Sequence, residues 1–250
     1  AGARSLRLLL KDAGKALIQV IDDGRGMGPA DARMAFERHA TSKLRAADDL
    51  FRLATFGFRG EALASIAAVA QVSLRTRRAT DELALELTLS GGALEGATPV
   101  AGPVGTSIAV RNLFYNIPAR RKFLKSNPVE LRHCVAEFVR AALSAPGVAF
   151  ALEHNGEPLY ALPAAPSLAA RIGALFPALA APGALLAVDE ATPLVGISGY
   201  VAAPQAARRA RGEQFFFANG RYIRDAYLHH AVAGAYEGLL EPEAVPGYFL

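Results

Sequence analysis

Residues 72–89 read VSLRTRRATDELALELTL, and the spacing of their apolar side chains decides the fold class. Val72, Leu74 and Thr76 occupy every second position of the first half, and the four leucines of residues 83–89 do the same in the second half. A period of two places successive side chains on opposite faces of a β-strand. The stretch therefore predicts two antiparallel strands with one buried face and one solvated face.

The sequence around this stretch mixes helices and strands without regular alternation. The apolar run Leu17–Ile21 predicts a buried strand, and Pro29–Arg38, with a proline in its first turn, predicts a helix. Ile108 and Val110 are expected to continue the sheet. Residues 148–162 hold an Asn-Gly turn between two apolar runs, which predicts a hairpin. Together these elements indicate an α+β fold and not a doubly wound parallel sheet.

The second half of the chain is expected to contain a smaller α/β unit. A helix is predicted to begin with Asn127 as its cap and Pro128 in its first turn. The proline-bounded residues 163–166 are the best candidate for a linker, which divides the chain into domains at 1–162 and 163–250. The elements predicted beyond it are a helix at Ser167–Phe176, strands at Leu185–Val188, Gly196–Ala202 and Phe215–Ala218, a helix from Asp225 to about Leu240, and a strand at Tyr248–Leu250.

Composition limits the class of protein. Hydrophobic residues make up 52% of the 250-residue chain and charged residues 20%, which is typical of a globular protein. No apolar run is long enough to span a bilayer, so no membrane association is expected. Cys134 is the one cysteine in the sequence, which excludes an internal disulfide and a cysteine metal cluster and favours a cytoplasmic protein. A net charge of +4 permits a polyanionic partner without requiring one.

Two common nucleotide-binding motifs are excluded by their spacing. The one Gly-Lys pair, Gly14-Lys15, is followed by Ala16, where a Walker A loop needs Ser or Thr. The glycine-rich residues 24–28 follow a predicted strand, but a dinucleotide-binding loop would need its third glycine at Pro29. Two acids also precede that loop, where a pyrophosphate would be repelled.

Asp22 suggests a different way of binding a nucleotide. It ends a predicted buried strand and is followed by Gly24 and Gly26. A carboxylate at such a position accepts a hydrogen bond from the exocyclic amine of adenine and repels the carbonyl of guanine. The glycines would let the backbone pass close to the base. Taken alone, the pattern is a weak signal and favours an ordinary acidic turn.

Two further segments carry groups that suit phosphates. Residues 57–63, GFRGEAL, form a loop that feeds an alanine-rich helix, whose free backbone N–H groups attract phosphate oxygens. Residues 38–43, RHATSK, offer two hydroxyls and an ammonium group. A plain glycine turn and a solvated lysine at the end of a helix are the alternative interpretations.

Taken together, these segments resemble the successive motifs of the GHKL ATPases, in the same order and with suitable gaps. The resemblance rests on residues 22–27 (DDGRGM), 38–43 (RHATSK), 57–66 (GFRGEALASI) and 105–107 (GTS). Within that group the chain resembles the MutL family of DNA mismatch-repair proteins, and not the topoisomerases, heat-shock chaperones or histidine kinases. That choice rests on the second and third motifs, on NLFYNIPARRKFLK at 112–125 and on FANGRYIRD at 217–225.

The resemblance implies an ATP site and a layered fold. The expected fold is a helix layer on a mixed, mainly antiparallel sheet, followed by a smaller α/β domain similar to a ribosomal protein. Asp22 is similar to the adenine-binding aspartate, and Asp23 stands where asparagine is more usual. Thr106 would support adenine through a water. The residues that the resemblance assigns to ATP are Asp22, Gly24, Gly26, Thr41, Ser42, Lys43, Gly57, Arg59, Gly60, Glu61, Ala62, Leu63 and Thr106.

Three family residues have no counterpart within the sequence. The general-base glutamate and the asparagine that binds Mg²⁺ are expected before Ala1, and a lysine that contacts the γ-phosphate is expected after Leu250. No catalytic residue and no metal ligand is therefore assigned within this chain, and hydrolysis by the chain alone is not expected. The segment Leu44–Phe58 is expected to act as a lid that is poorly ordered without nucleotide.

The implied function is DNA mismatch repair in the cytoplasm, in association with the nucleoid. ATP binding and slow hydrolysis would drive dimerisation of the N-terminal domains and signalling to a mismatch-recognition partner of the MutS type. Non-specific DNA binding is expected from Arg208, Arg209, Arg211, Arg221 and Arg224, with the clusters at residues 75–78 and 120–125 as alternatives. Each cluster is also typical of a solvated basic face. Two other functions stay open, namely a GHKL enzyme outside repair and a binding module without catalysis.

Overall fold

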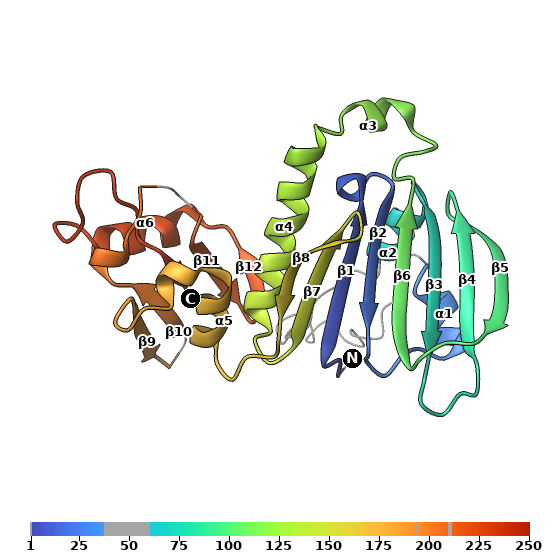
Figure 1. Cartoon of the computed structure of the whole chain (residues 1–250), viewed down its shortest axis with the longest axis horizontal. Helices are drawn as coiled ribbons and strands as arrows, with labels where there is room; N and C mark the ends of the chain where they lie inside the picture. The colour runs from blue at the N-terminus through green and yellow to red at the C-terminus, as the bar shows by residue number, and fades with distance from the viewer. Residues whose placement is uncertain (1, 38–60, 194, 210–211) are drawn as a thin grey trace. The chain divides into compact units, whose positions relative to one another are not determined.

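The computed structural model describes residues 2–37, 61–193, 195–209 and 212–250. They form two compact units, which are described separately (Figure 1). Unit 1 comprises Ala1–Phe138 and Gly147–Ala164, and unit 2 comprises Val139–Pro146 and Ala165–Leu250. Within the described residues, no helix combines the length and the hydropathy that are needed to cross a bilayer.

Unit 1 contains an eight-stranded sheet in the order β5-β4-β3-β6-β2-β1-β7-β8. Strands β1 and β7 pair in parallel, and the other neighbouring pairs are antiparallel. The prediction of a mixed, mainly antiparallel sheet is therefore confirmed. The strands are β1 (Ser5–Lys11), β2 (Leu17–Asp22), β3 (Gln71–Arg77), β4 (Ala84–Ser90), β5 (Ala93–Val100), β6 (Gly105–Arg111), β7 (Ala149–His154) and β8 (Glu157–Leu162).

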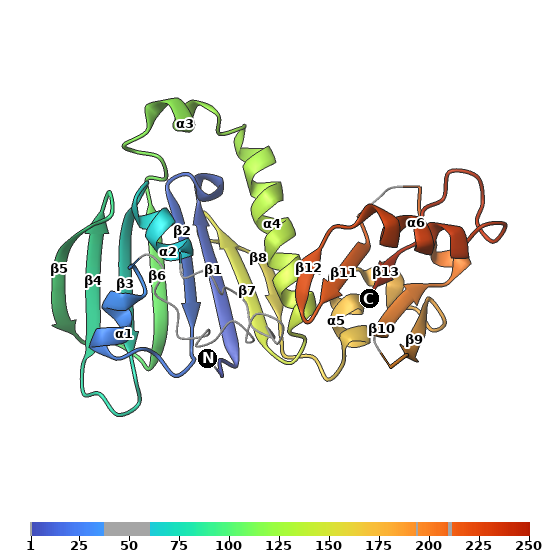
Figure 2. The ribbon, with the colours of Figure 1, turned by 180° about the vertical axis from the view of Figure 1, so that it is seen from behind.

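Two short helices of unit 1, α1 (Pro29–Met34) and α2 (Ala62–Ala67), cover one face of the sheet, as Figure 2 shows. Their alanines Ala32 and Ala67 are buried against Leu74 of β3 and Leu87 of β4. Small side chains let a helix approach a sheet closely, and the leucines fill the space between them. This core lies between the helices α1 and α2 and the strands β3 and β4.

The alternation at residues 72–89 forms β3 and β4 as predicted, with one correction. Val72, Leu74 and Thr76 are all buried on the helix-covered face. Leu83 lies before β4 and is 54% exposed, so it is not part of the buried face. The two strands pair in antiparallel register, as the pattern indicated.

Three predicted helix ends were wrong. α1 ends at Met34, before the predicted end at Arg38, which lies outside the described residues. α4 (Asn127–Ser144) takes Asn127 as its first residue, because the carbonyl of Ser126 already accepts the N–H of Glu130. α6 (Ala226–Ala235) ends before Leu240, and Gly238 with a φ of +76° follows that end.

Strands β1 and β5 were not predicted because each carries a misleading sequence pattern, and the three-residue β12 was not predicted either. β1 is broken in sequence by Arg7, and β5 contains Gly96 and Pro99, which are depleted in strand interiors. β5 tolerates both residues because it is the edge strand beside β4. α3 (Pro118–Lys122), also in unit 1, begins with a proline in its first turn.

Unit 2 holds a five-stranded sheet in the order β12-β11-β13-β10-β9. Its core consists of apolar side chains that include Leu143, Ile172, Phe215 and Phe249. The elements are α5 (Leu168–Leu175), β9 (Leu185–Ala191), β10 (Gly196–Ala202), β11 (Gln214–Ala218), β12 (Arg221–Ile223), α6 and β13 (Tyr248–Phe249). Ser167 caps α5 and Asp225 caps α6 through their side-chain oxygens, as expected for N-cap residues.

Candidate functional site

Three polar side chains from three neighbouring strands form one row in unit 1. Asp22 of β2 pairs with Thr106 of β6, and Thr106 pairs with Thr76 of β3. Directly paired residues of neighbouring strands project from the same face of a sheet. The register therefore brings together two residues that the sequence assigned to the site, and it adds a third. We call this set the polar row.

The polar row interrupts a face that is otherwise apolar. One step along the same strands, Val20 pairs with Ile108, which pairs with Leu74. Val20 nevertheless exposes 36% of its surface, so the face is open over β2 beside Asp22. Polar groups on an apolar face need hydrogen-bonding partners, which makes this end of the sheet a candidate binding site.

Asp22 has one carboxylate oxygen engaged and one without a partner among the described residues. Its Oδ1 accepts the backbone N–H of Gly24 at 2.9 Å. This bond bends the chain directly after β2 and holds the carboxylate at the strand end. The arrangement leaves the second oxygen able to accept a hydrogen bond from a ligand.

The glycines around the site are required by close packing of the backbone. Gly26 has a φ of +68°, and a Cβ atom there would lie 2.0 Å from the carbonyl oxygen of Arg77. Gly105 has a φ of +124°, and a Cβ atom there would lie 2.1 Å from the carbonyl oxygen of Asp22. The sequence suggested that glycine makes room for a base. The structure shows that glycine makes room for neighbouring strands.

The Thr76 hydroxyl connects the elements of the site. It accepts the backbone N–H of Met27 at 2.9 Å and donates to the carbonyl of Gly105 at 3.1 Å. It also lies 3.2 Å from the Thr106 hydroxyl. Sequence reasoning treated Thr76 only as a strand residue, although a hydroxyl at a buried position of an apolar alternation was a signal for it.

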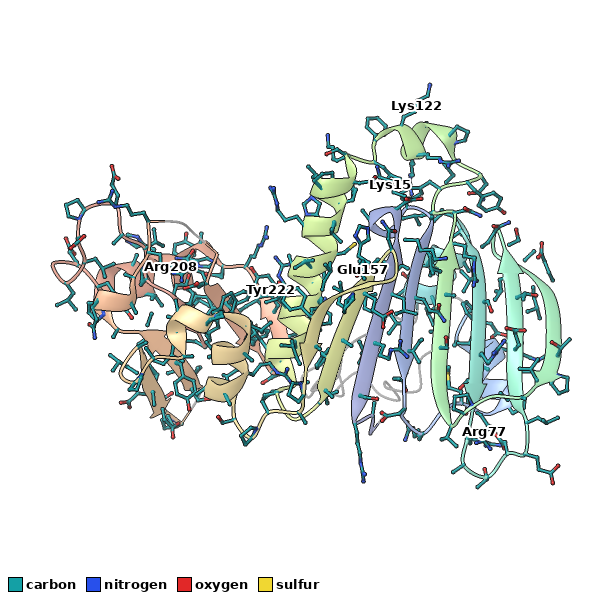
Figure 3. The ribbon with its side chains drawn as sticks, viewed as in Figure 1. Lys15, Arg77, Lys122, Glu157, Arg208 and Tyr222 are labelled. Atoms are coloured by element: carbon teal, nitrogen blue, oxygen red, sulfur yellow. The ribbon has the colours of Figure 1, made fainter. Side chains whose placement is uncertain are left out.

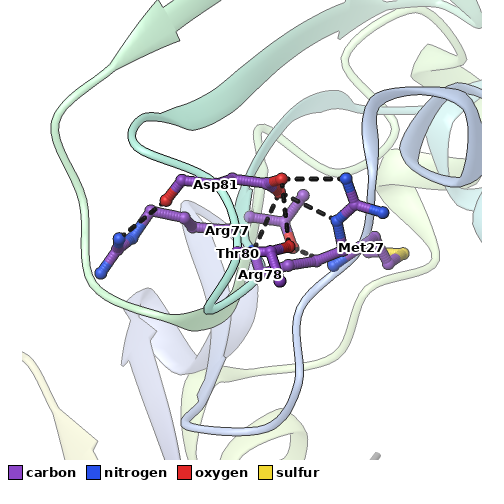
Figure 4. Close-up of polar contacts among 6 residues, drawn as sticks. Met27, Arg77, Arg78, Thr80 and Asp81 are labelled. Carbon is purple, nitrogen blue, oxygen red and sulfur yellow. Dashed lines mark hydrogen bonds and ion pairs between the residues drawn. The ribbon is translucent and has the colours of Figure 1, made fainter.

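The loop after β3 is held by a charged pair beside the site (Figure 4). The Arg78 guanidinium donates to both oxygens of Asp81, at 3.0 and 2.9 Å. These bonds lower the pKa of Asp81 and raise the pKa of Arg78. A Cβ atom at Gly28 would lie 2.9 Å from Arg78 Nη1, the end of a flexible side chain that can move aside.

Asp23 holds the start of β1 through its side chain. Its Oδ1 accepts the backbone N–H groups of Arg4 at 2.7 Å and Ser5 at 2.9 Å. These bonds, that from Ser5 first, lower the pKa of the Asp23 carboxyl. An asparagine Oδ1 could accept the same two N–H groups, so the aspartate at this position is compatible with the local structure.

Replacing Asp23 with alanine is expected to remove a pH-dependent part of the stability of unit 1. A carboxyl whose folded pKa is lowered stabilises the fold above its unfolded pKa and loses that contribution as the pH falls through the folded pKa. The urea midpoints of Asp23→Ala and the unmodified chain should therefore differ at neutral pH and converge in acid. A difference that stays constant across this range would contradict the assignment.

The structure places only part of the predicted phosphate-binding groups. Glu61 precedes α2, and Ala62 and Leu63 form its first turn. The other members of those two motifs, and the predicted lid, lie outside the described residues, namely Thr41, Ser42, Lys43, Gly57, Arg59, Gly60 and the segment Leu44–Phe58.

A cavity of about 700 Å³ lies elsewhere, within unit 2. It is bordered by β10 and β11 at the place where β13, between them, is only two residues long. Its walls carry apolar side chains such as Phe217, Ile223 and Leu228, and no charged side chain. A nucleotide phosphate would have no charge partner there, so the cavity is not the site that the sequence predicted.

Comparison with known proteins finds a family that matches part of the chain and relatives that match all of it. The family described as DNA mismatch repair protein, C-terminal domain, matches residues 179–250. The whole chain is 51% identical to the DNA mismatch repair protein MutL of Christiangramia forsetii and 52% identical to that of Phocaeicola vulgatus. In both cases the chain spans 40% of the length of the relative.

Solved structures match the fold. The Aquifex aeolicus MutL ATPase domain complexed with ADP is 26% identical, with a TM-score of 0.68 over 93% of this chain and 80% of that one. The N-terminal domain of a DNA repair protein has a TM-score of 0.81 over 100% of this chain and 78% of its own, and at 23% identity it shows the fold alone. The chain therefore belongs to the MutL family of DNA mismatch-repair proteins and corresponds to the N-terminal ATPase region of that family.

Proposed function

We propose that the chain binds ATP at the polar row, with Asp22 as the acceptor for the adenine amine. The observation that carries the proposal is the register of β2, β6 and β3, which aligns Asp22 with two hydroxyl groups. The Aquifex relative with a similar fold is complexed with ADP. Gly24 and Gly26 shape the loop beside the base, and Thr106 contributes a hydroxyl.

The phosphates are assigned to the two motifs on either side of the predicted lid. Glu61, Ala62 and Leu63 would contribute backbone N–H groups at the start of α2. The remaining groups assigned to the phosphates are Thr41, Ser42, Lys43, Gly57, Arg59 and Gly60. Residues 1–162 would form the nucleotide-binding domain and residues 163–250 a second domain.

Mg²⁺ is the metal that the family implies for such a site. Within the described residues, no group of three or more His, Cys, Asp or Glu side chains gathers closely enough to hold a metal ion. We therefore assign no Mg²⁺ ligand to these residues and derive no hydrolytic step through the metal.

The role of the longer protein follows from the family. ATP binding and slow hydrolysis would drive pairing of two N-terminal regions, and the paired state would signal to a MutS-type partner on DNA in the cytoplasm. An ordering transition that depends on the γ-phosphate is a common basis for such a switch. A binding module without hydrolysis is the alternative, and single-turnover hydrolysis in the longer protein separates the two.

Calorimetric titration of the unmodified chain with ATP and GTP tests the base assignment. ATP is expected to bind more tightly, because the carbonyl of guanine would face the carboxylate of Asp22. Equal affinities for the two nucleotides would remove the support for Asp22 as the adenine contact.

DNA binding is proposed for the basic residues of unit 2. These residues differ in whether another side chain already pairs with them. Arg208 Nη1 contacts Glu213 at 3.3 Å, and Arg224 Nε contacts the hydroxyl of Tyr222 at 3.4 Å. Arg208 and Tyr222 are labelled in Figure 3. Arg209 and Arg221 are exposed and have no partner among the described residues. Arg211 lies outside the described residues. Arg209 and Arg221 are therefore the best placed to contact phosphates.

The two alternative basic clusters also differ in whether their arginines are paired with acidic side chains. At residues 75–78, Arg75 pairs with Glu86 at 3.0 Å and Arg78 pairs with Asp81 at 2.9 Å. Surface pairing of this kind lowers the charge that the cluster offers to a polyanion. Arg120 and Arg121 on α3 are exposed and have no partner within the described part of the chain, so α3 is the stronger alternative.

Replacing Arg221 and Arg224 together with glutamate is expected to weaken DNA binding on every sequence alike. Contacts to phosphates carry no base information, and each lost contact should lower the log–log salt slope on duplex DNA by about 0.9. The measurement is fluorescence anisotropy at several salt concentrations.

A matched control is the double replacement of Arg120 and Arg121 with glutamate, which changes the net charge equally. If that variant loses affinity and the unit 2 variant does not, the DNA surface belongs to α3. ATP affinity should be unchanged in both variants.

A further inference from the structure

We infer that Thr76 determines base specificity by directing the hydroxyl proton of Thr106 away from the ligand. The inference rests on the proposed ATP site and adds a residue to it that the family motifs in the sequence did not include. Thr76 is 2% exposed. Water therefore cannot replace its hydroxyl as the hydrogen-bonding partner of the neighbouring groups.

The direction of each hydrogen bond follows from the chemistry of its partners. A threonine hydroxyl has one proton and two lone pairs. The Met27 N–H can only donate, so it occupies one lone pair of Thr76. The carbonyl of Gly105 can only accept, so it receives the one proton of Thr76.

Thr76 is then left with a single lone pair for its third contact. The Thr106 hydroxyl lies 3.2 Å away, and only Thr106 has a proton remaining for that bond. Thr106 must therefore be the donor. Its oxygen faces the site with lone pairs alone.

The site edge formed by Asp22 and Thr106 consequently offers acceptors only. The Asp22 carboxylate has no proton to give, and Thr106 has committed its own. Within the described residues no hydrogen bond joins Asp22 to Thr106, as expected for two acceptors. A donor must lie between them, and an exocyclic amine or a water molecule supplies one.

This edge favours an amine at position six of a purine over a carbonyl. Adenine presents an amine there, and hypoxanthine, otherwise similar, presents a carbonyl. Valine at position 76 keeps the shape of threonine but can neither accept nor donate a hydrogen bond. The Thr106 hydroxyl could then rotate and donate to the carbonyl, so discrimination between the two bases would decrease.

The test compares ATP with inosine triphosphate by calorimetry in the full chain and in three variants. Thr76→Val should lower the ratio of the two affinities by about tenfold, the effect of one hydrogen bond in a buried site. Thr76→Ser keeps the hydroxyl and should retain the ratio. Thr88→Val, on the opposite face of β4 from Leu87, is the control for loss of a threonine hydroxyl and should also retain it.

A second measurement does not need nucleotide. Hydrogen exchange at the Met27 amide should accelerate in Thr76→Val and stay slow in Thr76→Ser, because only valine removes the acceptor. An unchanged affinity ratio in Thr76→Val, or a Met27 amide that does not respond, overturns the inference. If the Met27 amide responds but the unmodified chain does not distinguish the two nucleotides, the proposed ATP site is what fails.

Discussion

Replacing Asp22 with asparagine is expected to abolish measurable ATP binding while leaving the fold intact. Oδ1 of Asp22 accepts the N–H of Gly24, and an asparagine oxygen can keep that bond. The second oxygen then becomes an NH₂ group. Its protons would face the protons of the adenine amine, so an attractive contact becomes a repulsive one.

The size of this effect follows from the loss of a hydrogen bond to a charged group. Such a bond contributes roughly 1.5–3 kcal/mol, which corresponds to more than a tenfold change in affinity. Calorimetric titration with ATP measures it, in a chain extended by the residues expected before Ala1. Asp189→Asn, an exposed position on β9 in unit 2, is the matched control.

Circular dichroism separates a local effect from loss of the fold. The Asp22→Asn variant should keep its spectrum and its unfolding transition, because the bond to Gly24 persists. An affinity equal to that of the unmodified chain would remove Asp22 from the adenine site.

Replacing Gly105 with alanine is expected to destabilise unit 1 more than any other single change considered for this site. The new Cβ atom would lie 2.1 Å from the carbonyl oxygen of Asp22, and the residue would keep a φ of +124° that side chains rarely adopt. Strand β6 must then move away from β2. Strain of this kind costs roughly 3 kcal/mol, with the lost strand pairing in addition.

Hydrogen exchange localises this effect better than a global unfolding curve, because the chain contains two units. The amides of β2 and β6 should lose protection, and those of unit 2 should not. Gly147→Ala is the matched control, because a Cβ atom there meets nothing within 4 Å. Full protection of β2 in Gly105→Ala would show that the sheet accommodates the new Cβ atom without separating the two strands, and would contradict this prediction.

Local signals in the sequence were sufficient for the elements with a strong period or a strong turn. The Asn155-Gly156 turn joins β7 to β8, and both of its residues have a positive φ, as a two-residue hairpin turn requires. Ser167 and Asp225 cap their helices as their side chains predict. Helix ends and edge strands were less predictable, because packing and sheet position decide them.

The candidate site was predictable by its residue types but not by its arrangement. The order of motifs identified Asp22 and Thr106 as residues near a base. The local sequence marks Thr76 only as a hydroxyl within an apolar alternation. Its role depends on Met27, which lies 49 positions away, and on Gly105, which lies 29 positions away. Such contacts arise from strand register, which short-range patterns do not encode.

The sequence by itself determined the family, the α+β class and the chemical character of the site, because these depend on residue identity and short-range periodicity. Only the tertiary structure decided that β2, β6 and β3 lie side by side and that their polar residues form one row. It also decided why glycine is needed at residues 26 and 105, where neighbouring backbones leave no space for a side chain. The direction of the Thr106 proton was decided there as well, because it depends on which donors and acceptors surround the buried Thr76 hydroxyl.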